Sequence, residues 1–73
     1  MNPTKRNGLE VLLNGATIGE IKMKPNSHTT KVVDGDGIIP TGEYSMNPEE
    51  IRGMIYRRLE REHPGKKIEI RLY

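Results

Sequence analysis

Two stretches of alternating apolar and polar residues open the chain, separated by a turn signal. Apolar residues recur at every second position from Leu9 to Leu13, and a second strand-like stretch runs from Thr17 to Met23. The dipeptide between them, Asn14-Gly15, strongly favours the two-residue turn of a β-hairpin. The sequence therefore predicts an antiparallel hairpin.

The second of these strands does not alternate regularly. Ile21 and Met23 share one face, whereas Ile18 has the opposite parity and Gly19 lies between them. A β-bulge at Gly19 would bring all three apolar side chains to the core face. We expect this strand to end at Pro25, because proline cannot donate a hydrogen bond to a neighbouring strand.

A second hairpin is predicted farther along the chain. Residues 29–33 form a third strand-like stretch, and Asp34-Gly35-Asp36-Gly37 has the composition of a flexible acidic turn. The apolar pair Ile38-Ile39 is then expected to return as a short fourth strand. Pro40-Thr41-Gly42 turns the chain again.

The helix is the best-marked element. Asn47 is a favourable N-cap, Pro48 suits the first helical position, and Glu50 is placed to complete a capping box. We predict a helix over residues 48–62, which ends at His63-Pro64-Gly65. Its apolar stripe, at helical spacing, consists of Ile51, Met54, Ile55 and Leu59.

The C-terminal stretch, residues 66–73, alternates without a fault and predicts a half-buried closing strand. The order of elements predicts a small α+β fold: one mainly antiparallel sheet, β-β-β-β-α-β along the chain, with one helix packed on one face. The 73 residues are expected to form a single domain, with residues 1–8 flexible.

The predicted core is aliphatic, because the sequence contains no Phe or Trp and only three Tyr. Leu12 and one of Val32 and Val33 fall outside it. The predicted core residues are Leu9, Val11, Leu13, Ile18, Ile21, Met23, Val32 or Val33, Ile38 or Ile39, Ile51, Met54, Ile55, Leu59, Ile68, Ile70 and Leu72.

A domain this short has a small core, so disulfides, metals or a second subunit often support such chains. The sequence has no Cys, which excludes disulfides, thiolate catalysis and Cys-based metal sites. The small size of the domain leaves homodimerisation open, and a third hypothesis is assembly of a homo-oligomer through exposed edge strands or Leu12. A chain without Cys is expected in a reducing compartment, the cytoplasm, or the host cytoplasm if a phage encodes it. Its longest apolar stretch is three residues, so no membrane partner is expected.

No pattern of catalytic or metal-binding residues is present. His28 and His63 have no spacing partners for zinc, and the Asp34–Gly37 segment fails as an EF-hand because Ile39 stands where glycine is required. A weak divalent-ion site on Asp34, Asp36 and Glu43 is left open. We therefore predict a protein that is not an enzyme and has no cofactor and no metal centre.

Charge is distributed unevenly. Residues 32–51 contain five acidic and no basic residues, whereas residues 52–73 contain seven basic and three acidic ones. The predicted protein-binding residues lie on the outer helix face, opposite the apolar stripe, and include the favoured interface types Tyr and Arg. They are Gly53, Tyr56, Arg57, Glu60 and Arg61.

Gly53 adds to this hypothesis, because glycine inside a helix costs about 1 kcal/mol relative to alanine and no core packing accounts for it here. The sequence thus favours a small protein-interaction module that binds through the outer helix face and the basic C-terminal third of the chain. Its small size is typical of inhibitors or accessory factors encoded by phages and other mobile elements.

The alternative is a nucleic-acid-binding domain. The formal net charge of +2 is far below the basic excess that such binding usually needs. The residues that would contact phosphates are Arg52, Arg57, Arg61, Lys66, Lys67 and Arg71.

Overall fold

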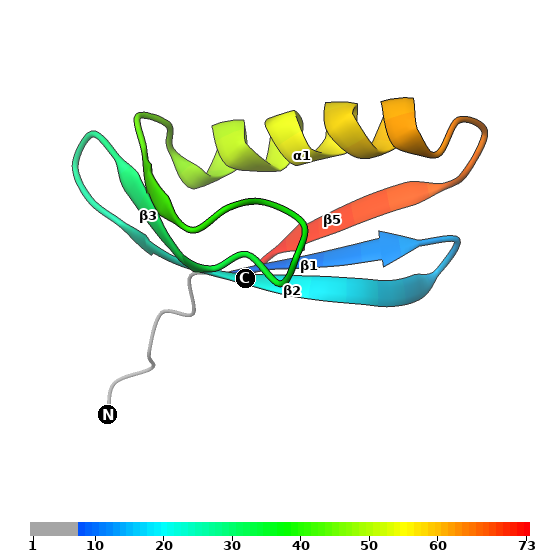
Figure 1. Ribbon diagram of the computed structural model, residues 1–73, viewed down its shortest axis with the longest axis horizontal. Coiled ribbons are helices and arrows are strands. Elements are labelled where there is room, and N and C mark those ends of the chain that lie inside the picture. The colour runs from blue at the N-terminus through cyan, green and yellow to red at the C-terminus, as the bar shows by residue number, and fades with distance from the viewer. Residues whose placement is uncertain (1–7) are drawn as a thin grey trace.

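The computed structural model describes residues 8–73, in which one antiparallel sheet of five strands carries one helix on one face (Figure 1). The predicted α+β class is confirmed. The strand order is β4-β3-β2-β1-β5, so the chain passes from one edge of the sheet to the other through the helix. The elements are β1 (Gly8–Leu13), β2 (Ala16–Pro25), β3 (Thr30–Asp34), β4 (Gly42–Tyr44), α1 (Pro48–Glu62) and β5 (Ile68–Leu72).

The β1–β2 hairpin forms as predicted. Asn14 and Gly15 have φ values of 53° and 84°, which are the left-handed conformations that a type I′ turn requires. A bulge is present, but one residue before the predicted position: Val11 pairs with Gly19 and Leu12 with Thr17, so Ile18 and not Gly19 is the unpaired residue.

The predicted burial of Ile18 is wrong. Its side chain is 43% exposed, because it borders a shallow depression beside Ile38 and Leu59 instead of lying under the helix. Gly19 itself has a different role. A Cβ atom there would lie 2.6 Å from Cδ1 of Ile38, so glycine allows the segment after β3 to lie directly on β2.

The short fourth strand is Gly42–Tyr44 and not Ile38-Ile39, which corrects the sequence-based expectation. The backbone N–H groups of Ile38 and Ile39 both donate to the carbonyl oxygen of Gly35, at 2.8 and 3.4 Å, so the pair belongs to a turn. The turn directs Ile39 into the core, where it is 5% exposed. Burial of this side chain outweighs the weak strand tendency of two residues.

Helix α1 has the predicted boundaries and cap. Oδ1 of Asn47 accepts a hydrogen bond from the backbone N–H of Glu50 at 2.8 Å, and the backbone N–H of Asn47 donates to Oε1 of Glu50 at 2.9 Å. The buried residues of the helix are Ile51, Ile55 and Leu59. This stripe packs on the sheet, so the opposite face of α1 points to solvent.

The core is aliphatic, as expected, and Val32 and not Val33 belongs to it. Val33 is 46% exposed because it is the unpaired residue of a second bulge, between β2 and β3. Leu13, Met54 and Ile68 are only half-buried. The cluster of buried residues is Leu9, Val11, Ile21, Met23, Val32, Ile39, Ile51, Ile55, Leu59 and Ile70.

The burial of two leucines differs from the prediction. Leu72, on the edge strand β5, is 38% exposed because no strand in the described chain lies beyond it. Leu12 is 6% exposed although it lies outside the core cluster, between its register partners Thr17 and Glu69 on neighbouring strands.

Gly8 was expected to be flexible but belongs to β1; residues 1–7 lie outside the described part. The backbone N–H of Gly8 donates to the carbonyl oxygen of Tyr73 at 2.8 Å, and the reverse bond is 2.9 Å. A Cβ on Gly8 would lie 3.0 Å from the Tyr73 ring, so glycine lets this ring lie against the strand.

Gly35 provides a test of the turn that places Ile39. A Cβ at position 35 would lie 1.8 Å from the carbonyl oxygen of Ile39, so Gly35→Ala must displace the turn backbone. We expect a loss of about 2 kcal/mol or more in the free energy of unfolding, measured by urea denaturation. The control is Gly53→Ala, whose Cβ has no close contact. Equal stability of Gly35→Ala and the unmodified protein would contradict this account.

Candidate functional site

The outer face of α1 holds the predicted protein-binding residues, and none of them is buried within the subunit. Tyr56 is 41% exposed, Arg57, Glu60 and Arg61 are exposed, and Gly53 is half-buried. Figure 1 shows this side of the helix facing away from the sheet along its whole length. The geometry that the hypothesis needs is therefore present.

A shallow depression of about 340 Å³ runs along one flank of this face. Arg57 and Arg61, one helical turn apart, line it together with Met54, which also packs against the core. Arg58 and Glu62 complete the lining. We call Met54, Arg57, Arg58 and Arg61 the α1 arginine surface.

The arginines of the helix are not equivalent. Arg52 forms an ion pair with Glu49, and Nε of Arg58 lies 3.4 Å from Oε2 of Glu62. Among residues 8–73, no ion pair involves Arg57 or Arg61. Their guanidinium groups are thus exposed without an acidic partner in the described chain.

Sequence reasoning identified Arg57 and Arg61 but missed Met54 and Arg58 as their neighbours. The spacing 54, 57, 58, 61 is the signal that identifies them, because residues three and four apart share one helix face. Tyr56 does not line the depression. It lies about 200° around the helix axis from Arg58, on the other flank.

Gly53 lies on the outer face, close to the α1 arginine surface. A Cβ atom at this position would meet only Nη1 of Arg57, at 3.6 Å, which is an ordinary contact. The fold of the described chain therefore does not require glycine here. A bare backbone is an advantage where another molecule approaches closely.

The residues of the nucleic-acid alternative do not form one surface. Arg71 lies on the sheet face away from α1, where its Nε is 3.0 Å from Oε2 of Glu69 and its Nη1 is 3.9 Å from Oε1 of Glu10. The hydrogen bond to Glu69 and the charge of that carboxylate raise the pKa of Arg71 above its usual value. Lys66 and Lys67 lie in the turn before β5. Arg57 and Arg61 are shared with the protein-binding set.

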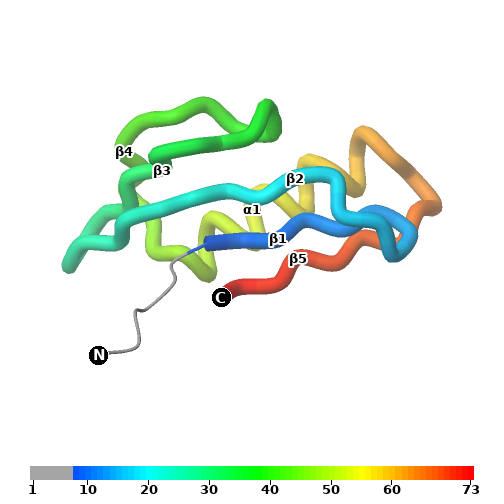
Figure 2. Tube along the Cα trace, turned by 90° about the horizontal axis from the view of Figure 1, so that it is seen from below, coloured from blue at the N-terminus to red at the C-terminus, as the bar shows by residue number. Residues whose placement is uncertain are grey.

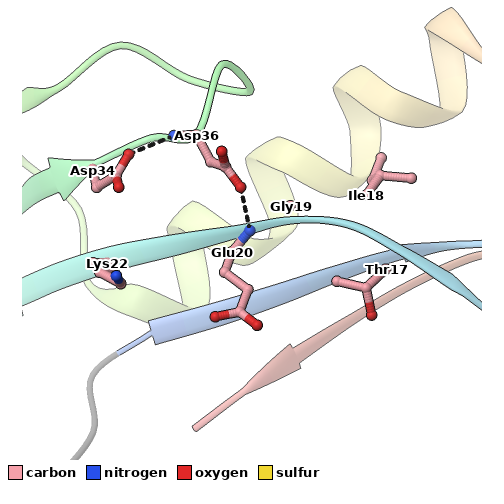
Figure 3. A pocket seen from close by; sticks show the side chains of 7 residues that line it. All are labelled: Thr17, Ile18, Gly19, Glu20, Lys22, Asp34 and Asp36. Atoms are coloured by element: carbon pink, nitrogen blue, oxygen red, sulfur yellow. Dashed lines mark hydrogen bonds between the residues drawn. The ribbon is translucent and has the colours of Figure 1, made fainter.

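The acidic segment contributes to the fold, as Figure 3 shows. The backbone N–H of Asp36 donates to Oδ1 of Asp34, and the backbone N–H of Glu20 donates to Oδ2 of Asp36, both at 2.9 Å. Oε2 of Glu43 instead accepts a hydrogen bond from the Thr29 hydroxyl at 3.1 Å. Within residues 8–73, no three acidic or histidine side chains converge, so the divalent site left open for Asp34, Asp36 and Glu43 is not assembled.

The chain shows no significant similarity to any protein-family model, curated protein or solved structure. No helix within residues 8–73 is long and apolar enough to cross a membrane.

Replacement of Gly53 tests whether this position is free of structural demands. Gly53→Ala is expected to raise the free energy of unfolding by about 1 kcal/mol, because alanine has the higher helix propensity and its methyl group meets no obstacle. Thermal denaturation followed by circular dichroism measures the change. A destabilised Gly53→Ala variant would show that the glycine is needed for the fold.

Proposed function

We propose that this chain is a small, non-enzymatic protein-interaction module whose α1 arginine surface binds an acidic segment of another protein. The observation that carries the proposal is the pair of exposed guanidinium groups, Arg57 and Arg61, with no acidic partner in the described chain, beside the half-buried Met54. Arginine is the charged residue most favoured at interface centres, and methionine adapts to irregular partner surfaces.

The chemistry of the surface favours a protein over a nucleic acid. Met54 contributes an apolar side chain to the lining of the depression, beside three arginines. Methionine and arginine are both enriched in protein–protein interfaces, whereas contacts to a phosphate backbone come from charged and polar groups. Arg71 also lies apart from the helix arginines, so these residues do not form one continuous surface for a phosphate backbone.

An interaction role needs no catalytic group, because binding by itself can block or assemble a partner. We infer an inhibitor or accessory factor acting in the cytoplasm, of the kind that phages and other mobile elements encode. Support for this last step comes only from the small size of the chain.

The test begins with a variant that carries a photo-crosslinking amino acid at position 60. This variant is added to a lysate of the native host and irradiated. The proteins crosslinked to it are then identified by mass spectrometry. Glu60 is exposed on the outer face and does not line the depression. The captured protein is then purified and its affinity measured by calorimetry.

Arg57→Ala/Arg61→Ala is expected to weaken this affinity by about tenfold or more, since truncation of an interface arginine commonly costs more than 1 kcal/mol. The control, Lys24→Ala/Lys31→Ala, removes the same charge from exposed residues of β2 and β3 and is expected to leave the affinity unchanged. Equal affinities for all three proteins would refute the proposed site. Binding of fluorescein-labelled DNA or RNA with a steep salt dependence would instead favour the nucleic-acid alternative.

A further inference from the structure

Strand β5 forms an open edge of the sheet. Within the described chain, its only neighbouring strand is β1. Figure 2 shows β5 as the outermost strand on its side, with α1 behind the strands. Natural edges are usually blunted by proline, bulges, covering segments or charged side chains, and β5 carries one charge of each sign. The sequence of β5, Ile-Glu-Ile-Arg-Leu, has no proline, and its register with β1 has no bulge.

The hydrogen bonds to β1 show which backbone groups of β5 point outward. Gly8 and Tyr73 exchange both N–H···O bonds, so the backbone groups of Tyr73 point toward β1. Hydrogen bonding alternates along an antiparallel strand, so Glu69 and Arg71 also direct theirs toward β1. The N–H and C=O groups of Ile68, Ile70 and Leu72 therefore point away from the sheet.

We propose that β5 pairs antiparallel with β5 of a second copy of this chain, about a two-fold axis that passes through Ile70. In this register Ile70 of the two copies face each other, and Ile68 faces Leu72 of the partner subunit. These are the residues whose backbone groups point outward, so each pair can exchange both of its N–H···O bonds. The pairing would also cover Leu72, which is 38% exposed in the single subunit, and the half-buried Ile68.

Charge selects this register. On the face away from α1, Glu69 stands opposite Arg71 of the partner subunit, and the symmetry of the axis repeats the pair. Moving the axis to Arg71 or to Glu69 would place like charges directly opposite each other, which destabilises antiparallel pairs. Among the registers centred on Glu69, Ile70 and Arg71, only the one centred on Ile70 pairs opposite charges.

A two-fold axis perpendicular to the sheet makes an isologous, closed dimer. Both helices then lie on the same face of one continuous sheet, and the outer face of each remains accessible. The inference is independent of the proposed function, because β5 and the α1 arginine surface share no residue. Joining two subunits would allow bivalent binding of a partner with two acidic segments.

The test measures self-association of the 73-residue chain by sedimentation equilibrium, with circular dichroism as the check of folding. The unmodified protein is expected to form a dimer. Glu69→Arg and Arg71→Glu are each expected to raise the dimer Kd by about tenfold or more, because like charges replace both opposite-charge pairs. Lys24→Glu, a comparable charge change on β2, is the control and leaves the Kd unchanged.

Two further experiments, which combine the substitutions, make the test specific to this register. An equimolar mixture of the Glu69→Arg and Arg71→Glu proteins is expected to form a heterodimer, because every cross-strand pair then joins opposite charges. The double variant Glu69→Arg/Arg71→Glu is expected to dimerise by itself for the same reason. Recovery in the mixture separates a lost interface from a folding defect, because neither single variant regains the Arg71–Glu69 contact within its own chain.

Monomeric unmodified protein at all concentrations up to about 1 mM, a weak limit for specific association, would overturn the proposal. A dimer whose Kd does not change with the single substitutions would also overturn it. Failure of the two single variants to form a heterodimer on mixing would have the same consequence. The dimerisation result does not affect the affinity measurement on the Arg57→Ala/Arg61→Ala variant, so the two proposals can fail separately.

Discussion

One helix must shield one face of a five-stranded sheet in this chain, and the rest of the structure depends on that constraint. Ile51 and Ile55 are fully buried against the strands, yet a single helix covers only a part of such a face. The segment between β3 and β4 supplies the remaining cover through Ile39. Its close approach explains why glycine stands at positions 19 and 35, where a side chain would collide with Ile38 or Ile39.

Within residues 8–73, no helix covers the opposite face of the sheet, which is stabilised by polar side chains instead. The Thr17 hydroxyl donates to Oε2 of Glu10 at 2.7 Å, and Arg71 lies between the carboxylates of Glu69 and Glu10. These long polar side chains surround Leu12 and account for its low exposure outside the core cluster. This face is therefore polar at its surface, and Leu12 is nevertheless shielded from solvent.

Two surfaces remain for other molecules once these demands are met: the outer side of α1 and the edge strand β5. The first is available because the apolar stripe of the helix turns its arginines outward. The second is available because α1 packs over the face of β5, whereas the outer edge of β5 has no neighbouring strand within residues 8–73 (Figure 2). Both proposals thus follow from the use of a single helix in a small domain.

The sequence by itself determined the elements whose signals are local. The Asn14-Gly15 turn, the Asn47–Glu50 capping box and the apolar stripe of α1 each depend on residues within a few positions of one another. The outward position of Arg57 and Arg61 follows from the same helical period.

Only the tertiary structure decided the strand order, the place of β4 and the burial of Ile39 instead of its neighbours. It also decided that Ile18, Val33 and Leu72 are exposed, that Met54 and Arg58 join the arginine surface, and that Arg71 lies apart from it. The physical reason is that alternation shows which side chains share a face but not which strands are neighbours or how far a covering helix extends. Those outcomes depend on contacts between residues far apart in the chain.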